Sequence, residues 1–413
     1  MELVTVEKEI IGNMVRLTGL VRSREGEKDV FFEYPEQFAP MVIESADPFV
    51  AALLLPAMTN SETLEILPPV SQRLWGNLPR IQEIFNCWYP ETLKKIQIRA
   101  DRFHETRAEG NGVGSFFSLG VDSFHTLLCH EEDVPGRERI SHLIYMMGFE
   151  VPLSEFTDGR ERSVMDHVHE AARIWNKEAI CGRTNIRDCF PLNWSRQYHG
   201  SALVATALSL GGGLHKALIP SSATWSNLMP WGSHPVIDPL WSSENMEIIH
   251  DGANADRVTK IMDTIALYPE ALRLLRVCVN KRGGSGNCGF CVKCIRTMTA
   301  LEMAGVLRSC GSFPPKLPRD FWRRMELKAF SLDATLRIAR KKNAPVWIID
   351  GLERALALGR INELRKARGY RRFSTDLFRY ALEKTAGRLF LLPNEIRRRR
   401  IRPRKPTVKP VAE

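Results

Sequence analysis

The feature that most constrains this chain is an alternation of short apolar runs and amphipathic segments that starts near residue 112. Alternating strands and helices are typical of a parallel sheet covered by helices, so the pattern predicts an α/β fold. In such sheets, ligands bind at the carboxyl ends of the strands. The first expected strand ends at 116–117, and the next three lie at 140–149, 180–184 and 218–219. Ser118, Arg183 and Ser221 therefore fall at carboxyl ends of strands.

The first of these strands leads into a turn of small residues, 118–123 (Ser-Leu-Gly-Val-Asp-Ser), and then directly into a helix. Free backbone N–H groups, two hydroxyls and the positive end of a helix dipole meet there, which suits an anion such as a polyphosphate. Gly120 lets the backbone approach a ligand, and Asp122 or Ser123 can cap the helix. An ordinary capped turn is the alternative. The phosphate loop of kinases and GTPases is excluded, because no Gly-x-x-x-x-Gly-Lys-Ser/Thr stretch occurs.

Four cysteines form a second pattern. Cys278 is followed ten residues later by Cys288, Cys291 and Cys294, and the loop between them is rich in glycine. Four thiols at this spacing supply the ligands of a closed tetrahedral zinc site. A ferredoxin cluster would need a cysteine where Met298 stands, and a thioredoxin-type pair would not need the third cysteine. We expect structural Zn²⁺, with a metal-free or redox role as the alternative.

The turn at 118–123 resembles the Ser-Gly-Gly-x-Asp-Ser loop of the N-type ATP pyrophosphatases, or PP-loop enzymes, with Leu119 in place of the first Gly. Together with the cysteine spacing and the Pro-Leu pair at 239–240, it resembles the 7-cyano-7-deazaguanine synthase branch over roughly residues 112–305. The Tyr-Pro-Asp-Cys stretch of that branch has no counterpart here. The resemblance implies an adenine nucleotide alpha hydrolase-like domain that cleaves ATP to AMP and pyrophosphate with the help of Mg²⁺.

The same resemblance implies site residues. Asp122 and Ser123 are the predicted catalytic residues, and Gly200 lies where relatives often contact the nucleotide. Arg183 flanks the third expected strand and could reach the phosphates, with a surface salt bridge as its alternative. Arg187, His199, Lys281 and Arg282 are further candidates, with salt bridges, a helix cap or solvated loop charges as their alternatives. The predicted ATP-binding set is Ser118, Leu119, Gly120, Val121, Asp122, Ser123, Arg183 and Gly200, and the predicted metal ligands are Cys278, Cys288, Cys291 and Cys294.

Three functional hypotheses follow. The first is an ATP-dependent ligase or synthase that adenylates a carboxylate or amide oxygen before a nitrogen nucleophile displaces AMP. The second is ATP-dependent thiolation of a tRNA base, with Cys181 or Cys189 as the sulfur carrier. The third is a non-catalytic, zinc-stabilised protein that binds a nucleotide or nucleic acid. Release of pyrophosphate would separate the first two hypotheses from the third.

Charge is concentrated at the end of the chain. The net charge is +10, but residues 396–413 hold eight Lys or Arg against one Glu, together with three prolines. Such a tail is expected to be disordered, and it could contact nucleic acid or remain solvated without a partner. No apolar run reaches the roughly 18 residues that a membrane span needs, and no signal peptide pattern opens the chain. The cysteines are clustered as in a metal site and not spread as in a disulfide framework, which suits a reducing compartment. We therefore expect a cytoplasmic protein.

The expected organisation has four parts: a β-rich module at 1–105, the ATP pyrophosphatase-like domain with its zinc site at 106–305, a helical region at 306–395 and the basic tail at 396–413. The expected partners are ATP and an unidentified small-molecule or modified-base substrate. Assembly into a homo-oligomer is left open.

Overall fold

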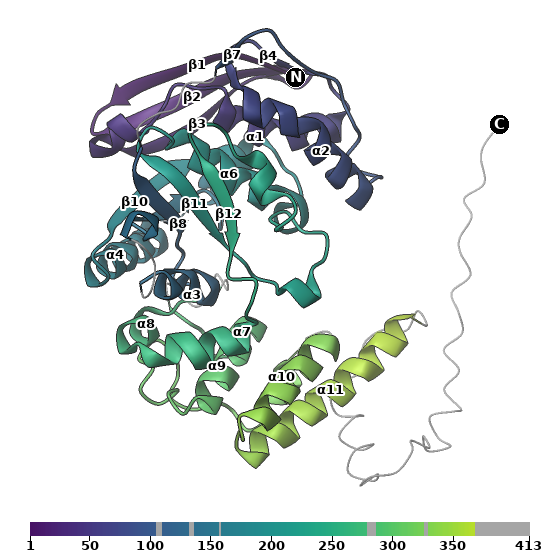
Figure 1. Ribbon diagram of the computed structural model, residues 1–413. Helices are drawn as coiled ribbons and strands as arrows, with labels where there is room; N and C mark the ends of the chain where they lie inside the picture. Colours follow the sequence, from purple (N-terminus) through teal and green to yellow (C-terminus); the bar gives the residue numbers. More distant parts are fainter. Residues whose placement is uncertain (105–109, 132–135, 157, 279–285, 326–328, 368–413) are drawn as a thin grey trace, which may run out of the picture. The chain divides into compact units, whose positions relative to one another are not determined.

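A computed structural model describes residues 1–104, 110–131, 136–156, 158–278, 286–325 and 329–367 (Figure 1). The chain divides into two compact units, Met1–Pro318 and Arg319–Glu413. The predicted boundary near residue 105 and the basic tail at 396–413 lie outside the described residues. Within the described ranges, no helix is long and apolar enough to cross a bilayer.

The larger unit is built on one ten-stranded sheet in the order β12-β11-β8-β9-β10-β3-β2-β1-β4-β6. The strands from β12 to β10 are parallel, those from β10 to β1 are antiparallel, and β1, β4 and β6 are parallel again. The predicted α/β class with a mostly parallel sheet is therefore confirmed. The strands are β1 Glu2–Ile11, β2 Met14–Ser23, β3 Gly26–Pro35, β4 Leu64–Ile66, β6 Ile98–Ala100, β8 Gly112–Phe116, β9 His142–Met147, β10 Glu178–Thr184, β11 Leu214–Pro220 and β12 Glu247–Asp251, with a separate pair formed by β5 Val70–Ser71 and β7 Phe103–His104.

Helices cover both faces of the sheet. Strands β8, β9 and β10 follow one another across the sheet, whereas β11 returns to the other side of β8. Because crossovers between parallel strands are right-handed, α3 and α4 lie on one face of the sheet and α6 lies on the other. The alternation of side chains along β9 agrees with this placement of the helices. Ile144 and Met146 join the core under α1 and α6, while Leu143 is buried on the opposite side. The helices are α1 Asp47–Asn60, α2 Gln72–Trp88, α3 Val121–Cys129, α4 Asp158–Ile174, α5 Ile186–Cys189, α6 His199–Ser209, α7 Arg257–Thr259, α8 Pro269–Leu274 and α9 Val292–Met303.

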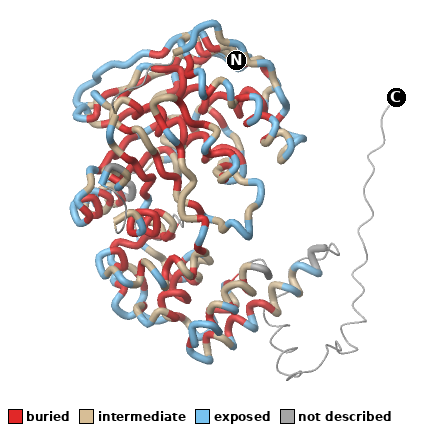
Figure 2. The backbone as a smooth tube through the Cα atoms, viewed as in Figure 1, coloured by how far each residue is buried: buried red, intermediate tan, exposed pale blue. Residues whose placement is uncertain are grey.

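The N-terminal segment continues the same sheet and also contributes two helices that the β-rich prediction did not include. Helix α1 is apolar on all sides and is buried almost throughout, which is expected for a helix enclosed by sheet and helix (Figure 2). It packs against α6, where the Tyr198 hydroxyl donates to the Ala52 carbonyl at 2.7 Å. Gly19 of β2 makes room for α1, since a Cβ there would lie 2.5 Å from the Phe49 ring.

The described part of the smaller unit is helical, as the pattern after Cys294 predicted. Its described part contains α10 Ala329–Lys341 and α11 Val346–Ala367, which pack together as a hairpin (Figure 1). Leu332 and Leu336 from α10 and Ile348 and Leu352 from α11 are buried.

Candidate anion-binding site and metal centre

The turn predicted from the sequence lies at the point where the chain reverses direction across the sheet. Strand β8 sits between β9 and β11, and the connections leaving these strands run to opposite faces. In open α/β sheets, such a switch point is where the crevice for a ligand forms. Residues 117–120 follow β8 and α3 begins at Val121, so the turn delivers the helix N-terminus to this crevice. The Ser123 hydroxyl donates to the Gly120 carbonyl at 3.1 Å and braces the turn. Gly120 itself is the N-cap residue of α3, and among the described residues no side chain caps this helix, so the predicted cap by Asp122 or Ser123 is not formed.

Leu119 has left-handed backbone geometry, with φ of 62°. This region favours glycine, which is the residue that the PP-loop pattern carries at this place. The Leu119 side chain is fully buried, while its carbonyl accepts a hydrogen bond from the Arg276 N–H at 2.8 Å. The side chain therefore packs into the protein interior and leaves the crevice to the backbone of the turn.

A polar cavity of about 130 Å³ opens beside this turn. Its wall is formed by the turn, by the loop that follows β9, by α7, by the segment before Cys278 and by α9. The residues that line it are Ser118, Gly120, Val121, Asp122, Glu150, Arg257, Arg276, Val277 and Lys293. Three cations and two carboxylates thus face a small space at a helix N-terminus, an arrangement suited to a phosphate group.

Asp122 is held between two cations. The Lys260 ammonium lies 3.2 Å from one carboxylate oxygen, and the Arg257 guanidinium lies 3.7 Å from the other. Lys260 is buried and also donates to the Ser221 carbonyl, at the end of β11. Asp256 accepts hydrogen bonds from the N–H groups of Val258 and Thr259 at 2.9 Å, which starts the helical segment that carries both cations.

Further positive charge lies on α9. Lys293 lines the cavity and is exposed, and Arg296 is half-buried. Partial burial, followed by the nearby Arg257 charge, lowers the pKa of the Lys293 ammonium, and the same two causes lower the pKa of Arg296 to about 10. Among the described residues, neither has a hydrogen bond or close ion pair. Lys293, which lines the cavity, is therefore available for an anionic ligand, whereas Arg296 lies outside the cavity wall.

Arg276 links this cavity to the segment that precedes Cys278. Its guanidinium forms a bidentate pair with the Glu150 carboxylate at 2.7 and 3.1 Å. Because its backbone N–H also binds the Leu119 carbonyl, the segment is attached to the phosphate turn at one end and to the cysteine cluster at the other.

The four predicted cysteines come together. All four sulfur atoms lie within 4.8 Å of one another, with Sγ–Sγ distances of 3.9 Å for Cys278–Cys291 and 3.8 Å for Cys288–Cys294. A tetrahedral zinc ion with Zn–S bonds of about 2.3 Å requires sulfur–sulfur edges of about 3.8 Å. The N–H of Cys294 donates to the Cys291 sulfur at 3.5 Å, so Cys291 also caps α9. The group can hold a metal such as zinc, and Lys281 and Arg282 of the intervening loop lie outside the described residues.

Other predicted residues lie away from the cavity. The Arg183 guanidinium binds the buried Glu33 carboxylate at 2.6 Å, which Arg16 binds from the other side, and so joins β10 to β3 and β2. Gly200 opens α6 against a neighbouring loop, where a Cβ would lie 1.9 Å from the Gly232 carbonyl oxygen. Arg187 stacks on the Trp194 ring at 4.7 Å. None of these residues is part of the cavity wall.

His199 is also placed elsewhere, with Nδ1 3.2 Å from the Trp194 carbonyl oxygen. The residues that the sequence interpretation missed are Glu150, Arg257, Lys260, Lys293 and Arg296. Only Lys293 and Arg296 carried a usable signal, because they flank Cys294 and must lie wherever the cysteine cluster lies.

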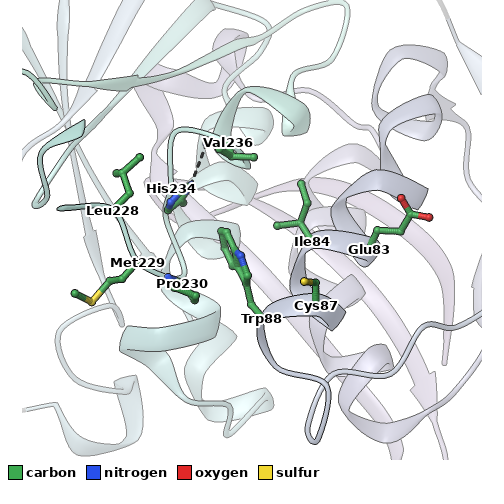
Figure 3. Close-up of a pocket in the computed structure, with 9 residues that line it drawn as sticks. All are labelled: Glu83, Ile84, Cys87, Trp88, Leu228, Met229, Pro230, His234 and Val236. Atoms are coloured by element: carbon green, nitrogen blue, oxygen red, sulfur yellow. Dashed lines mark hydrogen bonds between the residues drawn. The ribbon is translucent and has the colours of Figure 1, made fainter. Parts of the chain in front are cut away.

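A second cavity, of about 480 Å³, lies between α2 and the loop that precedes Asp238 (Figure 3). Its wall is mainly apolar, with Ile84 and Trp88 facing Leu228 and Met229 across it. The His234 Nδ1 accepts the Val236 N–H at 3.1 Å, and burial lowers the pKa of this imidazole. The residues that line this cavity include no Lys or Arg, so it does not suit a polyphosphate.

No protein-family model, curated protein or solved structure matches the chain. The functional assignment therefore depends on the geometry of the site.

Proposed function

We propose that this protein is an ATP-dependent, adenylate-forming ligase or synthase of the PP-loop type, with an adenine nucleotide alpha hydrolase-like domain. The observation that carries the proposal is the cation-rich cavity at the switch point, beside the glycine-containing turn at 118–123 and the N-terminus of α3. Backbone N–H groups, hydroxyls and guanidinium groups converging on one small cavity suit the β- and γ-phosphates of ATP.

In this proposal the residues of the cavity position ATP and neutralise charge. The turn at 118–123 holds the phosphate oxygens, and Arg257 and Lys293 face the charge that develops on the leaving pyrophosphate. Asp122 would hold a Mg²⁺ ion, which would add to this neutralisation when bound. A carboxylate or amide oxygen of the substrate attacks the α-phosphorus, and the bond from the α-phosphorus to the α,β-bridging oxygen breaks. A nitrogen nucleophile then displaces AMP, with no covalent enzyme intermediate.

The thiolation hypothesis receives less support from the cysteines. Burial raises the pKa of the Cys181 thiol to about 12 and that of the Cys189 thiol to about 11. Both thiols are therefore protonated at neutral pH, whereas a sulfur carrier acts as a thiolate. The buried position of Leu119 also removes the main reason to regard the turn as unable to bind phosphate, which weakens the case for a non-catalytic protein.

Product analysis with α-³²P-labelled ATP tests the proposal. Zinc-loaded protein should bind Mg·ATP, and a screen of candidate acids should identify one that produces labelled AMP and pyrophosphate. Asp122→Ala or Ser123→Ala should reduce turnover by a factor of about 10² or more, because Asp122 would hold the Mg²⁺ ion and Ser123 braces the turn that binds the phosphates. Asp333→Ala, on α10 of the other unit, is the matched control and should leave turnover unchanged. Formation of ADP and orthophosphate, or absence of ATP binding by folded protein, would refute the proposal.

A further inference from the structure

The cysteine cluster and the phosphate cavity share a wall, and the following inference rests on the proposed function. We infer that Lys293 binds the leaving pyrophosphate, that Arg296 outside the cavity wall adds positive charge, and that the cysteine-bound metal positions both, so that metal binding and pyrophosphate binding strengthen each other. The site thus extends from the turn at 118–123 to α9, and its ligand is pyrophosphate, a polyanion of two linked phosphate groups.

Chain connectivity supplies the first line of support. Arg276 and Val277, which line the cavity, immediately precede the metal ligand Cys278. Lys293 lies between the ligands Cys291 and Cys294, and Arg296 follows two residues later. Both walls on this side of the cavity are therefore within two residues of a cysteine of the cluster, and a metal ion would join them to each other.

The start of α9 supplies the second line of support. The Cys291 sulfur accepts the N–H of Cys294, so the ligand sulfur itself caps the first turn of the helix that carries Lys293. Capping of this kind determines where a helix begins and how its first side chains point. The direction of the Lys293 side chain is thus tied to the geometry of the cysteine cluster.

The balance of charge around the cavity supplies the third line of support. Lys260 is paired with Asp122, and Arg276 is paired with Glu150. Arg257 shares Asp122 with Lys260, at the longer distance of 3.7 Å. Lys293 and Arg296 have no such close partner among the described residues. Both lie near the Arg257 charge, and the carboxylates that also act on them, Asp122 with Glu150 or Asp256, are fewer than the cations gathered there. Cations gathered without equal negative charge repel one another, and a polyanion removes that repulsion.

These observations predict a reciprocal coupling. Without the metal, the segment at 276–278 and the first turn of α9 lose their cross-link, and mutual repulsion favours separation of the cations. Pyrophosphate affinity then falls. By linkage, bound pyrophosphate must raise the affinity of the cysteine cluster for its metal by the same factor. A purely structural metal site would show no such dependence.

Zinc release tests this coupling without any measure of turnover. Zinc-loaded protein is mixed with excess EDTA, and transfer of zinc is followed with and without saturating pyrophosphate, with sulfate at equal ionic strength as the comparison. We expect pyrophosphate to slow release by about tenfold, within the usual range of coupling between two sites. Because free pyrophosphate itself chelates zinc, any artefact would act in the opposite direction.

Variants locate the effect. Lys293→Met should abolish the slowing and weaken pyrophosphate binding measured by calorimetry, while Lys293→Arg should retain most of the slowing. Arg296→Met should have a smaller effect than Lys293→Met, because Arg296 lies outside the cavity wall. Arg308→Met is the matched control, because Arg308 is an exposed cation beyond α9 that does not line the cavity. Circular dichroism and a zinc content of one per chain verify that each variant is folded.

The outcomes separate the two proposals. If ATP binds but zinc release is unaffected by pyrophosphate, or if Lys293→Met and Arg308→Met behave alike, the coupling is refuted and the proposed function stands. If the zinc-loaded wild-type protein does not bind ATP, the proposed function fails. Slower zinc release by pyrophosphate in that case would still support the polyanion site on α9.

Discussion

Replacement of Leu119 tests the geometry of the phosphate turn most directly. Leu119 combines a fully buried side chain with a left-handed backbone, and these two properties act in opposite directions. Leu119→Ala removes the buried side chain and should lower the free energy of unfolding by about 2–5 kcal/mol. Leu119→Gly removes the same contacts but also relieves a backbone strain of about 1–2 kcal/mol. After allowance for the greater freedom of unfolded glycine, Leu119→Gly should be more stable than Leu119→Ala by about 1 kcal/mol.

A matched pair in α3 should show the reverse order. Leu127 is fully buried, as Leu119 is, but it lies within a right-handed helix. There, Leu127→Gly should be less stable than Leu127→Ala by about 1 kcal/mol, because glycine is the poorer helix former. Urea unfolding of the four variants, compared pairwise, measures both differences.

The same variants examine the relation of Leu119 to the cavity. Because its side chain packs into the interior and not into the cavity, Leu119→Gly should bind Mg·ATP with unchanged affinity at temperatures where it is fully folded. If Leu119→Gly is less stable than Leu119→Ala, the left-handed turn is wrong. If the folded variant loses ATP affinity, the leucine side chain contributes to the site and the reasoning fails.

Three further predictions concern metal, pH and the tail. Chelation of zinc, or replacement of the four cysteines by serine, should lower the melting temperature, since binding free energy of a structural metal is also folding free energy; unchanged melting curves would contradict the metal site. Burial lowers the pKa of His199, so the unfolded state takes up more protons and the free energy of unfolding should fall as the pH drops below about 6.5. This fall with pH should be smaller in His199→Gln, and equal slopes for the two proteins in urea titrations at several pH values would oppose the prediction. Deletion of residues 396–413 should leave the melting temperature and ATP turnover on small substrates nearly unchanged, and loss of turnover would place the tail in the active site. If a nucleic acid is bound, the same deletion should weaken binding and reduce its salt dependence.

The sequence alone was sufficient where the determining interactions are local. The turn at 118–123 follows β8 and starts α3 because its small residues let the chain pass from strand to helix within a few positions, with Gly120 at the N-cap. The cysteine spacing likewise predicted which residues gather, since a tight Cys-x-x-Cys-x-x-Cys segment leaves few arrangements for four thiols. The α/β class followed from the periodicity of the strands and helices, which each segment expresses by itself.

Strand order and the partners of individual charges were decided only by the tertiary structure. Arg183 ends a strand as predicted, but β10 pairs with β3, and the buried Glu33 opposite it binds the guanidinium. Lys260 reaches Asp122 across 138 positions of sequence because α3 and its own helical segment pack against each other. Nothing in the local pattern around a lysine specifies so distant a partner. The loss of chain entropy on closing such a long loop is offset only by burial summed over the whole unit, so the cation-rich wall of the cavity is a property of the assembled fold.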